Sequence, residues 1–122
     1  MVRYIVTDVD AAIRFYTTVL DFHIIMHPAP EFAILARGNL RLALNKPGGS
    51  GGGGMSMPDG TLPAPGGWNR FVIEVEDIGM AVEKIKESGG KFRNDIVTGI
   101  GGRQILLNDP SGNPVELFEY LR

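Results

Sequence analysis

The side chains with binding or catalytic chemistry are a few charged residues set into alternating, strand-like stretches. In NRFVIEVED, strand alternation puts Arg70 and Glu74 on the side opposite the apolar residues. Near the carboxyl end, PVELFEY carries Glu116 inside a similar pattern. A guanidinium can hold an anion, and a carboxylate can act as a general acid or base or bind a metal ion. Arg70, Glu74 and Glu116 are therefore the first candidates for a functional site.

Metal-ligating residues are sparse elsewhere in the chain. There is no cysteine, and the two histidines, His23 and His27, flank one predicted strand. Iron sites of the two-histidine, one-carboxylate type need all three groups on one face. His27 with Glu31 would be a thin ligand set. We therefore interpret both histidines as half-exposed residues at a strand edge.

The composition bounds the class of protein. A chain of 122 residues, 43% hydrophobic and 21% charged, is typical of one globular domain. The net charge of −2 argues against nucleic acid or an anionic membrane as partner. No run is long enough for a membrane helix, and the first residues show strand alternation rather than a signal-peptide pattern. Together with the absence of cysteine, this leads us to expect a cytoplasmic protein.

The chain reads as two similar halves. When the sequence is aligned with itself at an offset of 69 residues, VRYIVTDVDAAIRFY matches the stretch that begins at Phe71. In each half a period-2 run ends at an aspartate, Asp8 or Asp77, that suits a helix N-cap. The helices are expected to run to about Leu20 and Ser88. Short strand candidates follow each helix: FHIIM, FAILA and LRLAL, then IVTG, RQILLN and PVELFEY.

This order predicts an α+β fold of two paired β-α-β-β-β modules that form a cupped mixed sheet. The expected divisions are a first module at 1–45, a Gly/Pro-rich linker at 46–67 and a second module at 68–122. The linker holds nine of the seventeen glycines and exceeds the roughly 12–15 residues of an ordinary loop. We interpret it as a mobile cover over a cleft or as a tether.

Strand alternation sorts the strand residues into two faces. The face expected toward the helices is apolar: Val2, Tyr4, Val6, Leu40, Leu42, Leu44, Phe71, Ile73, Val75, Ile105, Leu107, Val115 and Leu117. The opposite face is mixed: Arg3, Ile5, Thr7, Arg41, Ala43, Arg70, Val72, Glu74, Gln104, Leu106, Glu116, Phe118 and Tyr120. Such mixtures are typical of ligand pockets. Trp68, beside a strand start, could stack on a ligand or simply pack, and "RND" at 93–95 is expected to be a solvated strand edge.

These features resemble the vicinal-oxygen-chelate superfamily, which includes glyoxalase I, extradiol dioxygenases, fosfomycin-resistance enzymes and bleomycin-resistance proteins. The resemblance covers essentially the whole chain. It rests on the duplicated strand-aspartate-helix, on FYTTVLDF and on LLNDPSGNPVELFEY. It implies the glyoxalase/bleomycin-resistance-like fold, with either metal-dependent chemistry or ligand binding, and often a dimer with pockets shared between chains.

The resemblance also implies where a metal would lie. Family ligands come from the first and last strand of each half, which correspond here to Met1, Ala43, Arg70 and Glu116. Of these only Glu116 suits a metal, and the fixed positive charge of Arg70 repels a divalent cation. Since both positions would point at one metal, we expect Arg70 to pair with Glu116 in the cation's place.

Three functional interpretations stay open. The favoured one is a small-molecule-binding protein, a homodimer without the metal centre. Its predicted ligand-binding residues are Arg70, Glu116, Glu74, Arg41, Arg3, Gln104, Trp68 and Phe118. The second is a metal-dependent lyase, isomerase or dioxygenase with zinc, nickel, manganese or iron at Glu116. The third is a metal-free enzyme in which Glu116 or Glu74 is the acid or base and Arg70 stabilises an anion.

Overall fold

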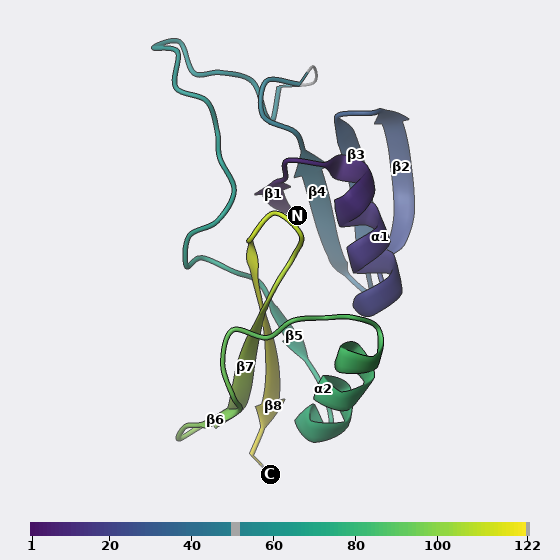
Figure 1. Cartoon of the computed structure of the whole chain (residues 1–122), viewed down its shortest axis with the longest axis vertical. Coiled ribbons are helices and arrows are strands. Elements are labelled where there is room, and N and C mark those ends of the chain that lie inside the picture. The colour runs from purple at the N-terminus through teal and green to yellow at the C-terminus, as the bar shows by residue number, and fades with distance from the viewer. Residues whose placement is uncertain (50–51, 122) are drawn as a thin grey trace.

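The computed structural model describes residues 1–49 and 52–121, so Ser50 and Gly51 of the expected linker lie outside the described residues. Module 1 contains β1 (Val2–Ile5), α1 (Val9–Val19), β2 (His23–Ala29), β3 (Phe32–Arg37) and β4 (Leu40–Asn45). Module 2 contains β5 (Val72–Glu74), α2 (Ile78–Glu87), β6 (Val97–Thr98), β7 (Gly102–Asn108) and β8 (Pro114–Tyr120). The predicted α+β class and the β-α-β-β-β order of both modules are confirmed (Figure 1).

Both helices begin where the sequence predicts. The carboxylate of Asp8 accepts a hydrogen bond from Ala11 N, and that of Asp77 accepts one from Met80 N, each at 3.0 Å. Both caps have extended backbone, which is the N-cap conformation. Each helix ends one residue earlier than expected, at Val19 and Glu87. Helix ends are the least sharply specified boundaries in a sequence.

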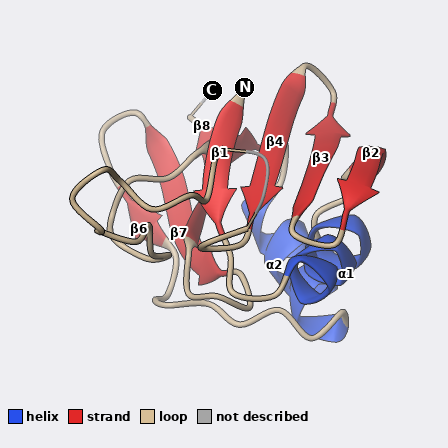
Figure 2. Cartoon of the chain, turned by 90° about the horizontal axis from the view of Figure 1, so that it is seen from above, coloured by secondary structure: helices blue, strands red, loops and turns tan. Residues whose placement is uncertain are grey.

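Each module builds its own four-stranded mixed sheet. The strand orders are β1-β4-β3-β2 and β5-β8-β7-β6. β1 is parallel to its neighbour β4, and β5 is parallel to its neighbour β8. All other neighbouring strands are antiparallel. Figure 2 shows both helices on one side of the strands. β5 places Val72 opposite Glu116, and this register brings the start of β5 to the middle of β8.

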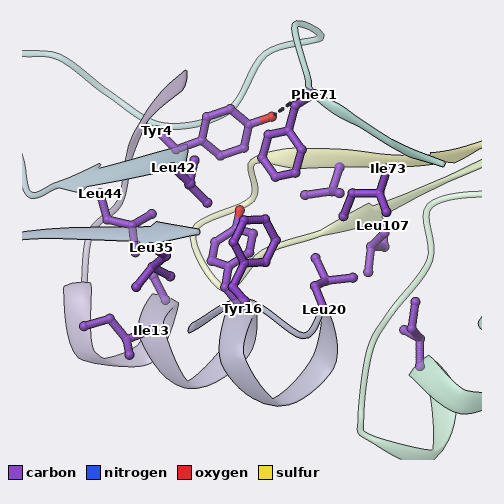
Figure 3. Close-up of a cluster of buried hydrophobic side chains, with 14 of the residues drawn as sticks. Tyr4, Ile13, Tyr16, Leu20, Leu35, Leu42, Leu44, Phe71, Ile73 and Leu107 are labelled. Carbon is purple, nitrogen blue, oxygen red and sulfur yellow. Dashed lines mark hydrogen bonds between the residues drawn. The ribbon is translucent and has the colours of Figure 1, made fainter. Parts of the chain in front are cut away.

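One hydrophobic core joins the two modules (Figure 3). The Tyr4 hydroxyl donates to Pro114 O at 2.7 Å and accepts from Phe71 N at 3.2 Å. The Tyr16 hydroxyl donates to the Asp109 carboxylate at 2.9 Å. Burial raises the pKa of Tyr4 to about 12 and also raises the pKa of Tyr16. Two buried tyrosines of module 1 are therefore bonded to module 2 in their neutral form.

The faces of the strands follow the predicted alternation. The residues predicted to face the helices are buried or packed against the core. No helix among the described residues is long and apolar enough to cross a membrane.

The described part of the linker runs from module 1 to β5 with most of its residues exposed. Gly66 N donates to Asn113 Oδ1 at 2.7 Å. Gly53 lies against the polar face of module 1, because a Cβ built on it would fall 1.7 Å from Arg3 Nη1 and 2.7 Å from Asn45 Oδ1. A side chain at this position would therefore require Arg3 or Asn45 to move.

Candidate functional site

An ion pair between Arg70 and Glu116 lies at the centre of the polar face of module 2. Arg70 Nε and Nη2 both donate to Glu116 Oε1, at 3.0 and 2.7 Å. Arg70 Nη1 donates to Trp68 O at 3.2 Å. The side chain of Glu116 is 8% exposed and that of Arg70 is 27% exposed. The structure therefore contains the pair that the sequence predicts.

The backbone explains why these two side chains meet. β5 and β8 are parallel neighbours, and Glu116 N donates to Phe71 O at 3.1 Å. Arg70 directly precedes that residue, so its side chain points across β8 on the face away from the core. A buried carboxylate is costly unless it is paired. The guanidinium supplies that pairing.

A cavity of about 340 Å³ lies beside the ion pair. Its walls are Trp68 and Arg70 before β5, residues of the 93–97 segment, and two residues of β7. The full lining is Trp68, Arg70, Arg93, Asn94, Val97, Gln104 and Leu106. We call it the β7 pocket. Its volume lies at the lower end of the roughly 300–1,000 Å³ of small-molecule sites.

The expectation for residues 93–95 is wrong for two of the three. Arg93 and Asn94 are half-buried and line the β7 pocket, whereas Asp95 is exposed. Asn94 Oδ1 accepts a hydrogen bond from Leu106 N at 3.1 Å, which ties this segment to β7. The partly buried Phe92 and Ile96 on either side anchor it to the core. Those two apolar residues were the signal in the sequence that the segment is not a free edge.

Arg93 is held in place by the end of β7 and the turn after it. Its Nε donates to Asn108 Oδ1, and its Nη2 donates to Gly112 O at 3.1 Å. Its guanidinium carbon lies 5.5 Å from the ring centroid of Trp68, in a cation–π arrangement. Arg93 thus links the turn to the exposed tryptophan across the pocket.

The other predicted site residues are divided between the two sheets. Trp68, Arg70 and Gln104 line the β7 pocket. Phe118 is half-buried on β8 with its ring centroid 4.8 Å from that of Tyr120, and Glu74 is exposed on β5. Arg3 and Arg41 belong to the sheet of module 1, are exposed, and do not line this pocket.

The residues at the four positions where the resemblance implies metal ligands do not form a ligand set. Met1 is 77% exposed, and Ala43 carries no donor atom. Glu116 already accepts two hydrogen bonds from Arg70. Within residues 1–49 and 52–121, no three His, Asp or Glu side chains are grouped so that they could hold a metal ion. His23 and His27 are exposed on the edge strand β2. These residues therefore do not fit the metal of the family.

One polar residue of module 1 was not foreseen. Asn45, at the end of β4, is 1% exposed, and its Oδ1 has no hydrogen-bond partner among the described residues. It lies beneath Gly53 beside Arg3. In the sequence it reads as an ordinary residue after a strand.

A larger cavity lies on the helix side of module 2. It measures about 500 Å³, and its lining includes Val82, Lys86, Phe92 and Ile105 together with Arg93 and Asn94. It does not reach the Arg70–Glu116 pair. Size alone therefore does not select the site, and we take the β7 pocket because it combines apolar walls with charged groups held in place.

Comparison with known protein families identifies the superfamily of the chain. Residues 1–117 match the model of the Glyoxalase/Bleomycin resistance protein/Dioxygenase superfamily. The chain belongs to this superfamily. No curated protein matches the chain.

Solved members of the superfamily share the fold at low identity. A member from Sphaerobacter thermophilus DSM 20745 is 26% identical, with 96% of this chain and 92% of that chain covered and a TM-score of 0.75. A lactoylglutathione lyase from Agrobacterium tumefaciens is 20% identical, with 98% and 91% covered and a TM-score of 0.75. TnmS3, an antibiotic binding protein from Streptomyces sp. CB03234, is 20% identical, with 98% and 92% covered and a TM-score of 0.71. Of the last two proteins, one is named as an enzyme and the other as a binding protein, both at 20% identity, so the likeness shows the fold alone.

Proposed function

We propose that this protein binds a small molecule in the β7 pocket and works without the metal centre of the superfamily. The observation that carries the proposal is the Arg70–Glu116 pair, at 2.7 Å. A metal at Glu116 would have to displace the guanidinium or tolerate a fixed positive charge beside it. The function is then recognition, with Arg70 holding the buried carboxylate.

The lining of the pocket supports binding. Trp68, Val97 and Leu106 offer apolar surface, and Gln104 and Asn94 offer amide groups at its edge. Small-molecule sites combine mostly apolar walls with a few converging polar groups. Trp68 is 72% exposed, so one large aromatic surface is open to a ligand.

We also propose that the protein is a homodimer. The edge strand β2 exposes Ile24, Ile25 and Met26, at 50, 43 and 43%. Apolar side chains along a free strand edge favour association with a second chain. Light scattering tests this directly: a dimer has twice the 13.2 kDa mass of one chain.

Metal content decides between this proposal and a metal-dependent lyase, isomerase or dioxygenase. Untagged protein is incubated with excess nickel, zinc, manganese or iron, desalted, and analysed for bound metal. We expect less than about a tenth of an equivalent in every case, the level of adventitious loading. Near-stoichiometric retention of one metal, lost in Glu116→Gln, would refute the metal-free proposal and support the metal-dependent enzyme. Arg103→Gln, which removes an arginine outside the pocket, is the matched control.

A further inference from the structure

The two arginines of the β7 pocket differ in what neutralises them. Among the described residues, ion pairs join Arg70 to Glu116, Lys84 to Asp21 and Arg103 to Glu119. Arg93 takes part in none of these. Its acceptors are an amide oxygen, a backbone carbonyl and the face of an indole ring, all of them neutral. Within residues 1–49 and 52–121, Arg93 therefore brings a positive charge to the pocket that no ion pair offsets.

The free charged donor of the pocket also lies on Arg93, whereas Gln104 and Trp68 contribute neutral donors. Every guanidinium nitrogen of Arg70 already donates to Glu116 or to Trp68 O. In Arg93, Nε and Nη2 donate to the turn, and no hydrogen bond among the described residues uses Nη1. Because its two other nitrogens are held, the guanidinium is oriented before any ligand arrives. A preorganised, half-buried cation with a free donor suits an anionic group.

The surroundings of Arg93 are flat and apolar. The indole of Trp68 lies against its guanidinium, and Val97 and Leu106 line the same pocket. An aromatic ring can pack on these surfaces while a substituent reaches Nη1. At about 340 Å³, the pocket suits one or two fused rings rather than a long or branched molecule.

We infer that the β7 pocket selects a planar aromatic monoanion, whose carboxylate accepts hydrogen bonds from Arg93 Nη1 and whose ring packs on Trp68 and Leu106. This inference rests on the proposed binding function and adds the class of ligand. We infer a single negative charge on the ligand from the charges around the pocket. The guanidinium groups of Arg70 and Arg93 carry two positive charges, and the carboxylate of Glu116 offsets one of them. Arg93 is the residue that sets the charge of the ligand, and Arg70 holds Glu116.

Three probes that share one ring system test the charge. 2-Naphthoate, 2-naphthamide and 2-naphthylmethylammonium carry the same ring system with a negative, neutral or positive group. Trp68 is the only tryptophan, so the single indole N–H signal in a ¹H–¹⁵N spectrum of the full chain reports on this pocket. We expect the naphthoate to bind at least about tenfold more tightly than the naphthamide, the ratio for one charge-assisted hydrogen bond. We expect the ammonium probe to bind most weakly.

Variants then assign the effect to Arg93. Arg93→Gln should weaken naphthoate binding about tenfold or more and change naphthamide binding less than about twofold. Arg93→Lys, which keeps the charge, should recover part of the naphthoate affinity. Arg103→Gln is the matched control, because Arg103 lies on β7 paired with Glu119 and does not line the pocket. It should leave all three affinities unchanged.

The outcomes separate the inference from the function it rests on. Naphthamide or the ammonium probe binding as tightly as naphthoate would overturn the anion selectivity and leave the binding function standing. No shift of the Trp68 signal with any probe would overturn both. If Arg93→Gln does not fold, the comparison of the three probes on the unmodified protein decides the question alone.

Discussion

Replacing Arg70 by glutamine should destabilise the protein through Glu116 rather than through Arg70 itself. The variant leaves a carboxylate whose side chain is 8% exposed without its two charge-assisted hydrogen bonds. Removing one partner of a fully buried pair costs about 3–5 kcal/mol. Because the arginine is 27% exposed and water can partly replace it, we expect a loss of about 1–3 kcal/mol of unfolding free energy.

The double variant Arg70→Gln/Glu116→Gln should regain most of that loss. It removes the orphaned charge and leaves two amides of similar shape that can bond to each other. Urea denaturation at pH 7, followed by circular dichroism, measures all three unfolding free energies.

Arg103→Gln is the control for this experiment. It breaks the Arg103–Glu119 pair, whose side chains are 38% and 15% exposed, and should cost only about 0–1 kcal/mol. An Arg70→Gln variant within about 0.5 kcal/mol of the unmodified protein would refute the view that Arg70 holds Glu116 in the fold. So would a double variant no more stable than Arg70→Gln.

Three further predictions concern the scaffold. Tyr4→Phe should lower the unfolding free energy by about 1–3 kcal/mol, because the carbonyl of Pro114 and the amide of Phe71 lose their partner; a loss below 0.5 kcal/mol in urea denaturation would contradict this. Gly102→Ala should lower the unfolding free energy by about 1–3 kcal/mol, because the added Cβ would clash with the backbone oxygen of Glu119. Gly101→Ala is the control: a Cβ there has no atom within 4 Å, so its melting temperature should equal that of the unmodified protein. Arg103 and the amide of Ile78 lower the pKa of Glu119 below its usual 4.5, so its charged form stabilises the fold above that pH and the contribution disappears as the pH falls through the lowered value. The difference in melting temperature between the protein and Glu119→Gln should therefore shrink from pH 6 to pH 3, and a constant difference would argue against it.

The local chemistry of this protein is readable from its sequence. Asp8 and Asp77 cap the two helices because a side-chain oxygen can satisfy an amide three residues on, a contact that needs no other part of the chain. The assignment of residues to the two faces of each strand also holds, because alternation is a property of the pleat itself. The ion pair of Arg70 with Glu116 could also be predicted, because the resemblance implies that both residues stand where ligands of one metal would converge.

The 93–97 segment shows what local sequence patterns do not predict. Arg93 and Asn94 look like solvated residues before a strand, and nothing near them in sequence indicates a pocket. Contacts with Asn108, Gly112 and Leu106 bring them to β7, and those partners lie 12 to 19 residues away. Asn45 was missed for a similar reason, because Gly53 covers it from the linker.

The sequence by itself determined the repeated module, the helix starts, the apolar faces and the mixed polar face, because each depends on neighbouring residues and on the periods of helix and strand. Only the tertiary structure decided which polar residues share a pocket. Alternation assigns a side chain to a face, but the order of strands across a sheet and the path of the loops set its position on that face. Arg70, Gln104 and Arg93 meet at β7, while Arg3 and Arg41 lie on the other sheet.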